Sequence, residues 1–356
     1  MQILYDTQIF LSQKIGGISR YHYELFKGMK QLGCDVKTAG LFVRNQYVLE
    51  NKNLRKSFVH DPFCIFKSVN NFMLKRAVQN LPENAVFHPS NTYDFLNNEI
   101  PQVKNLTFTI HDMIVEKQNI DFGKNKLYYA QHAKKIIAVS ETTKKDIIDL
   151  FGIDGNKIDV IYHGSSLNKQ MVKKPNAAIP EQFLLYVGER SGYKNFINFV
   201  RAATPLLKKY NDLHLLCAGK KPFNKQEISV LQELGVTDKV ISFSKIDDNT
   251  LAYLYCKAAA FVFPSLFEGF GIPILEAWAC NAPVILSDNA CFREVAAEAA
   301  CYFDPLSQDS MTNEIEEVLK NNELRQDLIL KGTSRLRLFS WEKTVEQTHK
   351  LYQSLL

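Results

Sequence analysis

Two glutamates, Glu268 and Glu276, stand eight positions apart in the stretch EGFGIPILE at residues 268–276. Two glycines follow the first glutamate, and Pro273 stands where the first turn of a helix would begin. Backbone N–H groups at a helix N-terminus attract phosphate, whereas carboxylates accept hydrogen bonds from hydroxyls. Phosphate donors flanked by hydroxyl acceptors would fit a nucleoside-diphosphate sugar. On this stretch alone, the two glutamates could equally be the solvated ends of a packing segment.

Two cations, Arg190 and Lys194, follow the apolar run FLLYVG at residues 183–188. An arginine fork and a lysine point charge at the end of a buried strand can together hold a diphosphate. Taken alone, the pair could also be two solvated cations of a loop.

Two further features end or follow apolar runs in the first half of the chain. His111 follows the run at residues 106–110, where a polar side chain at a strand end can face a ligand. Gly16 and Gly17 precede a helix predicted at residues 19–32, with Ser19 as its N-cap. The alternatives are a structural histidine and an ordinary Gly-Gly turn.

The elements that must position these residues alternate between short buried strands and amphipathic helices. This alternation predicts parallel sheets covered by helices. The predicted strands are residues 1–5, 35–42, 85–88, 106–110, 136–140, 158–163, 183–188, 213–219, 240–244, 259–263 and 283–287. The predicted helices include residues 19–32, 142–150, 196–210, 225–234 and 249–258, and one beginning at Pro273.

The pattern runs twice, which predicts two Rossmann-like, doubly wound α/β domains facing a central cleft. The first domain is predicted at residues 1–165, a polar linker at 166–182 and the second domain at 183–338. Residues 339–356 read as an amphipathic helix after an N-cap at Ser340 that packs back on the first domain. Ligands of such sheets bind beyond the carboxyl ends of the strands, which is where the residues above stand.

Composition narrows the class of protein. The 356 residues carry a net charge of +5, and the excess of positive charge lies in the first half. This mild charge gives no reason to expect nucleic acid as a partner. Seven cysteines without a C-x-x-C pair predict free thiols in a reducing compartment. No signal peptide and no apolar run of roughly 20 residues is found, so we expect a soluble cytoplasmic protein.

Two absent motifs narrow the chemistry further. The fingerprint G-x-G-x-x-G does not occur, which argues against a nicotinamide enzyme. Neither a D-x-D sequence nor a Cys/His cluster occurs, so we expect no bound metal. No other cofactor is expected.

Taken together, the motifs resemble those of the retaining glycosyltransferases of family GT4, which have the GT-B fold. EGFGIPILE is similar to their E-x7-E motif, and the segments GGISRYHYEL, HDMI, VSETTKKDI, VGERSGYKN and PVILSD occur in the order of that family. The resemblance covers almost the whole chain. It departs at GERSGYK, where a glutamate and a serine flank Arg190.

The resemblance implies roles for the matching residues. Glu276 would hold the ribose hydroxyls, Arg190 and Lys194 would neutralise the diphosphate, Glu268 would contact the transferred sugar, and His111 would lie beside sugar and acceptor. The implied catalytic residues are His111, Glu268, Arg190 and Lys194. The implied donor-binding residues are Gly16, Gly17, Arg190, Lys194, Ile246, Glu268, Gly269, Phe270, Gly271, Ile272 and Glu276.

The implied reaction moves a hexose from a GDP- or UDP-sugar to a saccharide or lipid-linked saccharide acceptor with retention, in surface polysaccharide synthesis. The alternatives are a nucleotide-sugar epimerase or hydrolase on the same scaffold and a protein that binds nucleotide sugars without turnover. Residues 58–76 mix aromatic residues with Lys67, Lys75 and Arg76, which predicts either contact with a membrane surface or an ordinary packed helix.

Overall fold

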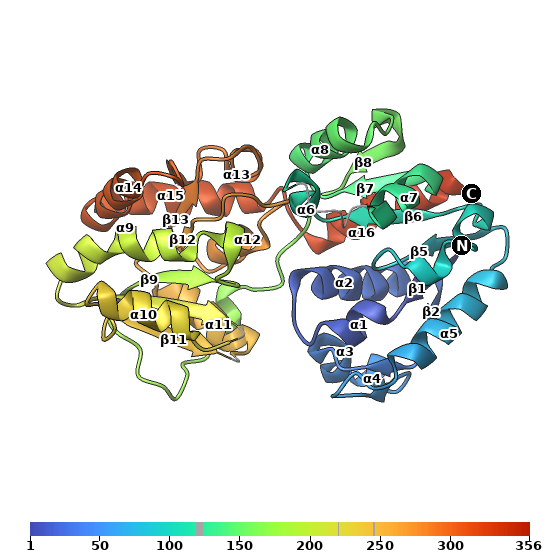
Figure 1. Cartoon of the computed structure of the whole chain (residues 1–356), viewed down its shortest axis with the longest axis horizontal. Coiled ribbons are helices and arrows are strands. Elements are labelled where there is room, and N and C mark those ends of the chain that lie inside the picture. The colour runs from blue at the N-terminus through green and yellow to red at the C-terminus, as the bar shows by residue number, and fades with distance from the viewer. Residues whose placement is uncertain (119–123, 220, 245) are drawn as a thin grey trace. The chain divides into compact units, whose positions relative to one another are not determined.

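The computed structural model describes residues 1–118, 124–219, 221–244 and 246–356 and divides into two compact units. Unit 1 contains Met1–His163 together with Trp341–Leu356, and unit 2 contains Gly164–Ser340. Both units are built on parallel strands that alternate with helices along the chain (Figure 1). The predicted α/β class is confirmed.

Unit 1 contains two three-stranded parallel sheets. Their orders are β2-β1-β5 and β6-β7-β8, and a parallel bridge from Phe87 to Leu106 connects β5 to the start of β6. Buried Ile, Leu, Val and Phe side chains from these strands form the core. The strands are β1 (Gln2–Asp6), β2 (Asp35–Ala39), β5 (Ala85–His88), β6 (Thr107–Ile110), β7 (Lys135–Ala138) and β8 (Ile158–Val160), with the short pair β3 (Phe42–Val43) and β4 (Val59–His60) outside the two sheets.

Helices follow or flank these strands in unit 1 (Figure 1). They are α1 (Gln8–Ser12), α2 (Gly17–Gln31), α3 (Gln46–Glu50), α4 (Lys52–Arg55), α5 (Lys67–Gln79), α6 (Ile114–Lys117), α7 (Lys124–His132), α8 (Glu141–Phe151) and α16 (Trp341–Leu355).

Several predicted boundaries in unit 1 were wrong. The strand expected at 35–42 ends at Ala39, because Gly40 takes a φ of +119°, which is not strand geometry. The strand expected at 158–163 ends at Val160. The helix expected at 19–32 begins at Gly17, two residues earlier, so Ser19 lies inside its first turn and is not the N-cap.

Unit 2 contains one six-stranded parallel sheet of order β11-β10-β9-β12-β13-β14. This is the strand order of a dinucleotide-binding fold, with its switch point between β9 and β12. The strands are β9 (Gln182–Val187), β10 (Leu213–Gly219), β11 (Val240–Ser244), β12 (Ala260–Phe263), β13 (Val284–Ser287) and β14 (Cys301–Phe303). The helices are α9 (Phe196–Lys209), α10 (Lys225–Glu233), α11 (Asp248–Lys257), α12 (Ile272–Ala279), α13 (Ala290–Ala296), α14 (Gln308–Lys320) and α15 (Asn322–Leu336).

The main core of unit 2 lies between this sheet and the helices α9 and α14. Phe199 and Leu207 of α9 and Ile315 of α14 are fully buried there with Leu215 and Val262 of the sheet. Apolar residues on one face of each helix meet near-continuous apolar strands, which is the sequence pattern of a parallel sheet covered by helices. The core holds the strands rigidly, so their carboxyl ends can position side chains.

The segment predicted as a linker at 166–182 belongs to unit 2. It contains a short 3-10 turn at Lys169–Met171, and Lys173 N donates to Asn249 O at 3.4 Å. The chain passes between the units at His163/Gly164 and again at Ser340/Trp341.

The last helix, α16, packs against α2 in unit 1 (Figure 1). Thr344 Oγ1 donates to Tyr162 O at 2.7 Å, and Tyr352 OH lies 2.8 Å from Tyr5 OH. The two helices approach closely at Gly28, where an added Cβ would lie 2.4 Å from Cγ2 of Val345. Only glycine fits at that crossing.

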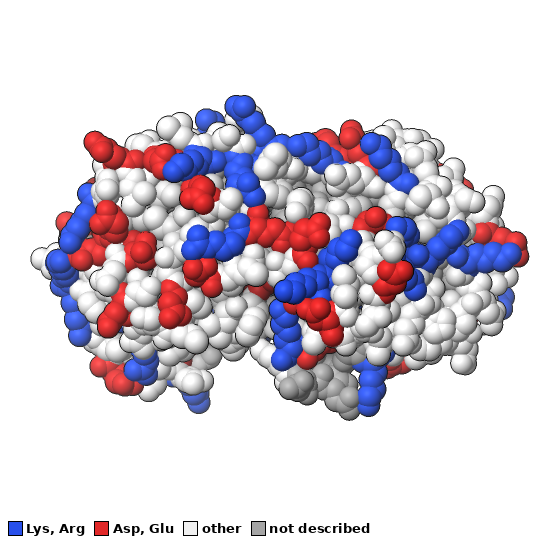
Figure 2. Space-filling view, turned by 90° about the horizontal axis from the view of Figure 1, so that it is seen from above, with Lys and Arg blue, Asp and Glu red and all other residues white. Residues whose placement is uncertain are grey.

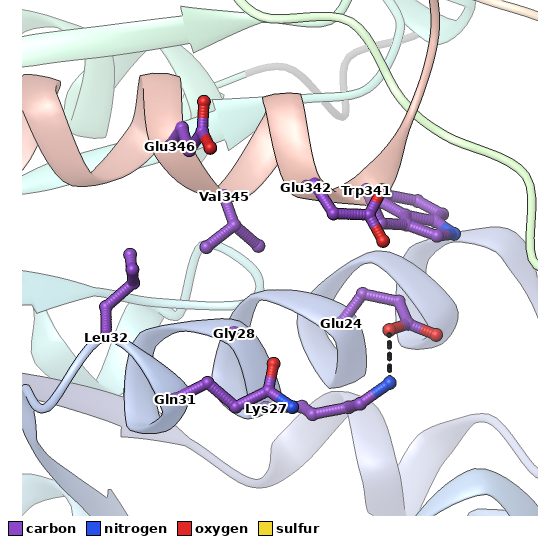
Figure 3. Close-up of a pocket in the computed structure, with 9 residues that line it drawn as sticks. All are labelled: Glu24, Lys27, Gly28, Gln31, Leu32, Trp341, Glu342, Val345 and Glu346. Carbon is purple, nitrogen blue, oxygen red and sulfur yellow. Dashed lines mark hydrogen bonds and ion pairs between the residues drawn. The ribbon is translucent and has the colours of Figure 1, made fainter.

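A groove of about 200 Å³ runs along the seam between α2 and α16 (Figure 3). Glu24, Glu342 and Glu346 line it, and Lys27 pairs with Glu24 at 3.5 Å. It contains none of the residues that the sequence singled out.

Lys and Arg are intermingled with Asp and Glu over the face drawn in Figure 2. Among the described residues, no helix is both long and apolar enough to cross a membrane.

Candidate functional site

The candidate site of unit 2 lies at the switch point of its sheet. β9 and β12 are neighbours, and the chain leaves their carboxyl ends through residues 188–195 and 264–271. Loops at such a switch point form a crevice in which ligands bind. Arg190, Lys194 and Glu268 stand on these two loops, so the structure brings together residues that are far apart in the sequence.

Lys194 and Glu268 join the two loops directly. Lys194 Nζ lies 2.5 Å from Glu268 Oε1, and the two side chains are 18% and 12% exposed. The ammonium also lies 5.0 Å from the ring centroid of Tyr193 and 5.6 Å from that of Phe263. A charged pair this far withdrawn from water is held by mutual hydrogen bonding. Because an ammonium has three donors, Lys194 can keep this contact and still reach a phosphate.

Arg190 has a buried partner that sequence reasoning missed. Its Nε and Nη2 lie 2.9 Å and 3.3 Å from the two carboxylate oxygens of Glu227, and Nη2 also donates to the carbonyls of Lys221 and Pro222. The Arg190 and Glu227 side chains are only 7% and 6% exposed. Glu227 in turn completes the capping box of α10 with Asn224. A capping box can be read from Asn224-x-x-Glu227, but nothing in the sequence connects it with Arg190.

The arginine is thus a structural brace between the β9 loop and α10. Among the described residues, its hydrogen bonds use Nε and Nη2, which leaves Nη1 as the nitrogen able to meet a ligand. The diphosphate role predicted for Arg190 stays a prediction.

The glycine-rich turn before α12 has a shape that only glycine supports. Gly271 caps α12 with a φ of +103°, in the left-handed region. An added Cβ there would lie 2.9 Å from Cδ1 of Ile274 and 3.2 Å from Cε1 of Phe292. Phe270 is 4% exposed and packs edge-on against Phe339 at 5.8 Å. The turn is therefore anchored by apolar contacts, and it presents the backbone of Gly271 and Ile272 at the N-terminus of α12.

Glu276 lies one turn inside α12 and is only partly buried. Tyr255 of α11 donates its hydroxyl to Glu276 Oε2 at 3.2 Å. Burial raises the pKa of Tyr255, and the nearby Glu276 carboxylate raises it further. The phenol therefore stays protonated and orients the carboxylate. Tyr255 is a site residue that sequence reasoning missed, because its place in an apolar helix reads as core.

The remaining predicted residues of unit 2 lie around the same edge. Gly269 stands in the β12 loop, and Ile246 follows β11 and is half-buried. β11 is the edge strand, two strands away from β9.

In unit 1, the turn predicted to bind phosphate is already capped by the chain itself. Gly16 is the N-cap of α2 and Gly17 its first residue. The side-chain oxygen of Gln13 accepts from Ser19 N at 3.3 Å, and Ser19 Oγ donates to Gly16 O at 3.0 Å. Gln13 thus occupies a donor that a phosphate would use, and it was not singled out in the sequence.

His111 lies at the end of β6 within a cluster of four histidines around Tyr21. The ring of Tyr21 lies 5.1 Å from those of His22 and His111 and 4.9 Å from that of His163, and His88 lies 5.5 Å from His22. Burial lowers the pKa of His111 to about 4. Its ring is therefore neutral at pH 7, and its buried Nε2 has no hydrogen-bond partner among the described residues.

The cluster is tied to the core through His88. His88 Nδ1 lies 2.5 Å from Tyr352 OH of α16, and Nε2 lies 3.0 Å from Thr109 Oγ1. Thr109 Oγ1 also meets Tyr21 OH at 2.7 Å. Sequence reasoning found only His111, because the four histidines come from separate segments and no motif links them.

A cavity of about 430 Å³ opens at the carboxyl ends of β1 and β5 in unit 1. Its walls come from α1, from the segment after β5, from α5 and the loop before it, and from the start of α7. Most of its polar lining consists of amides and hydroxyls, with Lys67 and Asp94 as the charged residues and Tyr93 and Phe95 as the aromatic ones. Amides, hydroxyls and aromatic faces are the groups that bind a neutral polyhydroxylated ligand.

The buried carboxylate Asp6 fixes one wall of this cavity. It accepts hydrogen bonds from Ser90 N and Oγ at 2.5 Å and 2.6 Å, from Gln8 N at 2.8 Å and from Tyr93 OH at 3.0 Å. Burial raises the pKa of Asp6 while these donors lower it. Asp6 therefore holds the chain after β1 and the chain after β5 together.

Two family models match the chain and together cover most of it. The model for glycosyl transferases group 1 matches residues 168–335, and the model for glycosyltransferase family 4 matches residues 15–169.

Two curated relatives are mannosyltransferases. The chain is 33% identical to the O-antigen chain mannosyltransferase RfbU of Salmonella typhimurium over 62% of this chain and 62% of that protein. It is 24% identical to the O-antigen chain mannosyltransferase B of Escherichia coli over the full length of both.

Among solved structures, that of Anabaena HepE in complex with UDP and glucose has a TM-score of 0.75. The match covers 99% of this chain and all of that one, at 16% identity. These matches agree with the two Rossmann-like units described above. The chain belongs to the family 4 glycosyltransferases and has the GT-B fold.

Proposed function

We propose that the protein transfers a hexosyl group, with mannose as the first candidate, from a GDP- or UDP-sugar to a saccharide acceptor during surface polysaccharide synthesis. The observation that carries this proposal is the arrangement of Lys194, Glu268 and Glu276 around the switch point of unit 2. The similarity to two O-antigen mannosyltransferases supports the choice of mannose and of the process.

The donor is proposed to lie across the N-terminus of α12. Glu276, held by Tyr255, accepts from the ribose hydroxyls, and the backbone near Gly271 and Ile272 with Lys194 meets the diphosphate. Glu268 faces the transferred sugar, and Ile246 meets the base through its backbone. Arg190 contributes through Nη1 and by bracing the loop that carries Lys194.

The developing charge on the diphosphate leaving group is proposed to be stabilised by these donors without a metal ion. Glu268 is held at 2.5 Å by Lys194. A carboxylate in such a pair is a weaker nucleophile, which favours the same-face route over a double displacement through Glu268. In the same-face route, the leaving phosphate takes the proton of the acceptor hydroxyl as that oxygen bonds to the anomeric carbon.

The acceptor is proposed to enter the cavity of unit 1 beside Tyr93 and Phe95, as the saccharide of a lipid-linked molecule. His111, neutral at pH 7, would accept a hydrogen bond from a sugar hydroxyl. The enzyme would work in the cytoplasm, at the inner face of the membrane.

The test is a product analysis of purified protein with GDP-mannose and a panel of UDP-sugars, with and without a lipid-linked saccharide, in EDTA. We expect nucleoside diphosphate to appear only with acceptor, together with an α-linked product. Conversion of the sugar without acceptor would indicate an epimerase or hydrolase, and binding without turnover on any acceptor would indicate a non-catalytic protein.

A further inference from the structure

Residues 59–76 of unit 1, here called the docking surface, expose large apolar side chains. Phe63 is 80% exposed, Ile65 68% and Phe72 65%. Val59, Phe66, Val69 and Met73 are also exposed. Scattered apolar side chains on a surface are ordinary, but seven within one short segment mark a contact site.

Three of these side chains, Val69, Phe72 and Met73, belong to α5, and the other four precede it. Its buried residues are Asn70, Leu74 and Val78. At about 100° per residue, Val69, Phe72 and the exposed Arg76 point away from that buried face, and Met73 flanks it. A helix on the surface of a soluble domain normally places polar residues there. Packing within unit 1 therefore does not explain this apolar stripe.

The charge in and just before the docking surface is predominantly positive. Residues 52–76 contain six Lys or Arg and one Asp. The carboxylate, Asp61, is 3% exposed and accepts from Phe66 N at 2.9 Å. Lys75 pairs with Glu99 at 3.2 Å, whereas the other five cations have no ion pair among the described residues. A second copy of the chain would bring equal positive charge to the same surface, so charge favours an anionic partner.

We propose that the docking surface binds an anionic phospholipid bilayer, with its apolar side chains in the headgroup region and its cations on the lipid phosphates. Exposed aromatic residues interleaved with Lys and Arg are the side chains that such an interface stabilises. Lys67 and Asn71, one helical turn apart on α5, line the 430 Å³ cavity. The bilayer would therefore lie beside the cavity, within reach of the saccharide of an acceptor anchored in it. Only this last step rests on the proposed function.

The test is flotation of the full-length protein with vesicles of phosphatidylglycerol and phosphatidylcholine, and with pure phosphatidylcholine. Binding should occur on the anionic vesicles and weaken in high salt. The variant F63S/F72S should bind the anionic vesicles at least about tenfold more weakly than the wild type. The variant K67Q/R76Q should bind them about fivefold more weakly for each charge removed.

The matched control is L306S/L330S, because Leu306 and Leu330 of unit 2 are 78% and 69% exposed. Its binding should equal that of the wild type. All four apolar residues are exposed, so none of these changes removes a core contact, and circular dichroism should be unchanged.

Wild-type flotation by F63S/F72S would overturn the proposal. The proposal would also be overturned if sedimentation showed that the wild type is a dimer and F63S/F72S a monomer, because the apolar stripe would then be an interface between copies of the chain.

Activity assays separate this inference from the proposed function. F63S/F72S should transfer sugar normally to a soluble, lipid-free acceptor but at least tenfold more slowly to an acceptor in vesicles. Normal transfer to both would overturn the docking inference alone. Vesicle binding without transfer from any nucleotide sugar would overturn the proposed function alone.

Discussion

Because His88 is buried, we expect unit 1 to lose stability as the pH falls from 7 to 5. Its side chain is fully buried, and burial lowers its pKa to about 3, with a smaller contribution from His111. The unfolded chain binds a proton near pH 6.5, so below that pH the unfolded state holds more protons than the folded state. The stability contributed by neutral His88 therefore falls as the pH drops, and the loss levels off near the folded pKa.

The magnitude follows from the two pKa values. At about 1.4 kcal/mol per pH unit, one histidine that stays neutral when folded costs about 2 kcal/mol of unfolding free energy between pH 7 and pH 5. For a domain of this size, that change lowers Tm by roughly 4–8 °C. The wild type should lose more than this, because burial also lowers the pKa of His22, His111 and His163.

The measurement is urea unfolding of the wild type and of His88→Gln at pH 7 and pH 5. The variant should be less stable at pH 7, because Tyr352 and Thr109 each lose one of their hydrogen-bond partners, but its loss of stability on acidification should be about 2 kcal/mol smaller. His132→Gln is the control, since His132 is exposed. An acid-induced loss as large in His88→Gln as in the wild type would refute the reasoning.

Five further variants test single residues of the site and of the packing. In steady-state kinetics, Glu276→Ala should raise the donor KM at least tenfold. Tyr255→Phe should raise the donor KM about fivefold, because it removes the 3.2 Å hydrogen bond that orients Glu276. Arg190→Ala should destabilise unit 2 by about 3–5 kcal/mol in urea unfolding, because buried Glu227 loses its partner; unchanged unfolding would mean that Arg190 is no brace. Gly271→Ala should weaken nucleotide binding in calorimetry, since its φ of +103° and the 2.9 Å approach to Ile274 both exclude a methyl group. Gly28→Ala should lower Tm through the contact of α2 with α16, and a normal Tm would contradict that packing.

The sequence predicted the layout because a parallel sheet requires near-continuous apolar strands, and these can be read directly. It also predicted which residues stand at strand ends, such as Arg190, Lys194 and Glu268. The boundary errors arose from local backbone chemistry. Ser19 resembled an N-cap, yet the helix starts earlier at Gly17, because the side chain of Gln13 reaches back to the N–H of Ser19.

Partners across the fold could not be predicted. Glu227 lies 37 positions from Arg190, and Tyr352 lies 264 positions from His88. A pairing of this kind depends on which strands become neighbours, and apolar periodicity carries no such information. The order β11-β10-β9-β12 decides which loops meet.

The different partners of Arg190 and Lys194 show how the order of the strands affects function. Both stand on the β9 loop, and nothing in their spacing along the chain predicts different roles for them. In the structure, Nε and Nη2 of Arg190 donate hydrogen bonds to Glu227 and to two backbone carbonyls. Lys194 instead pairs with Glu268 across the switch point. A ligand would have to compete with a buried bidentate pair to engage the fork of Arg190, whereas the ammonium of Lys194 already lies at the switch point beside Glu268. Lys194 is therefore the better candidate for direct contact with the diphosphate, and Arg190 acts first by holding the loop that presents it.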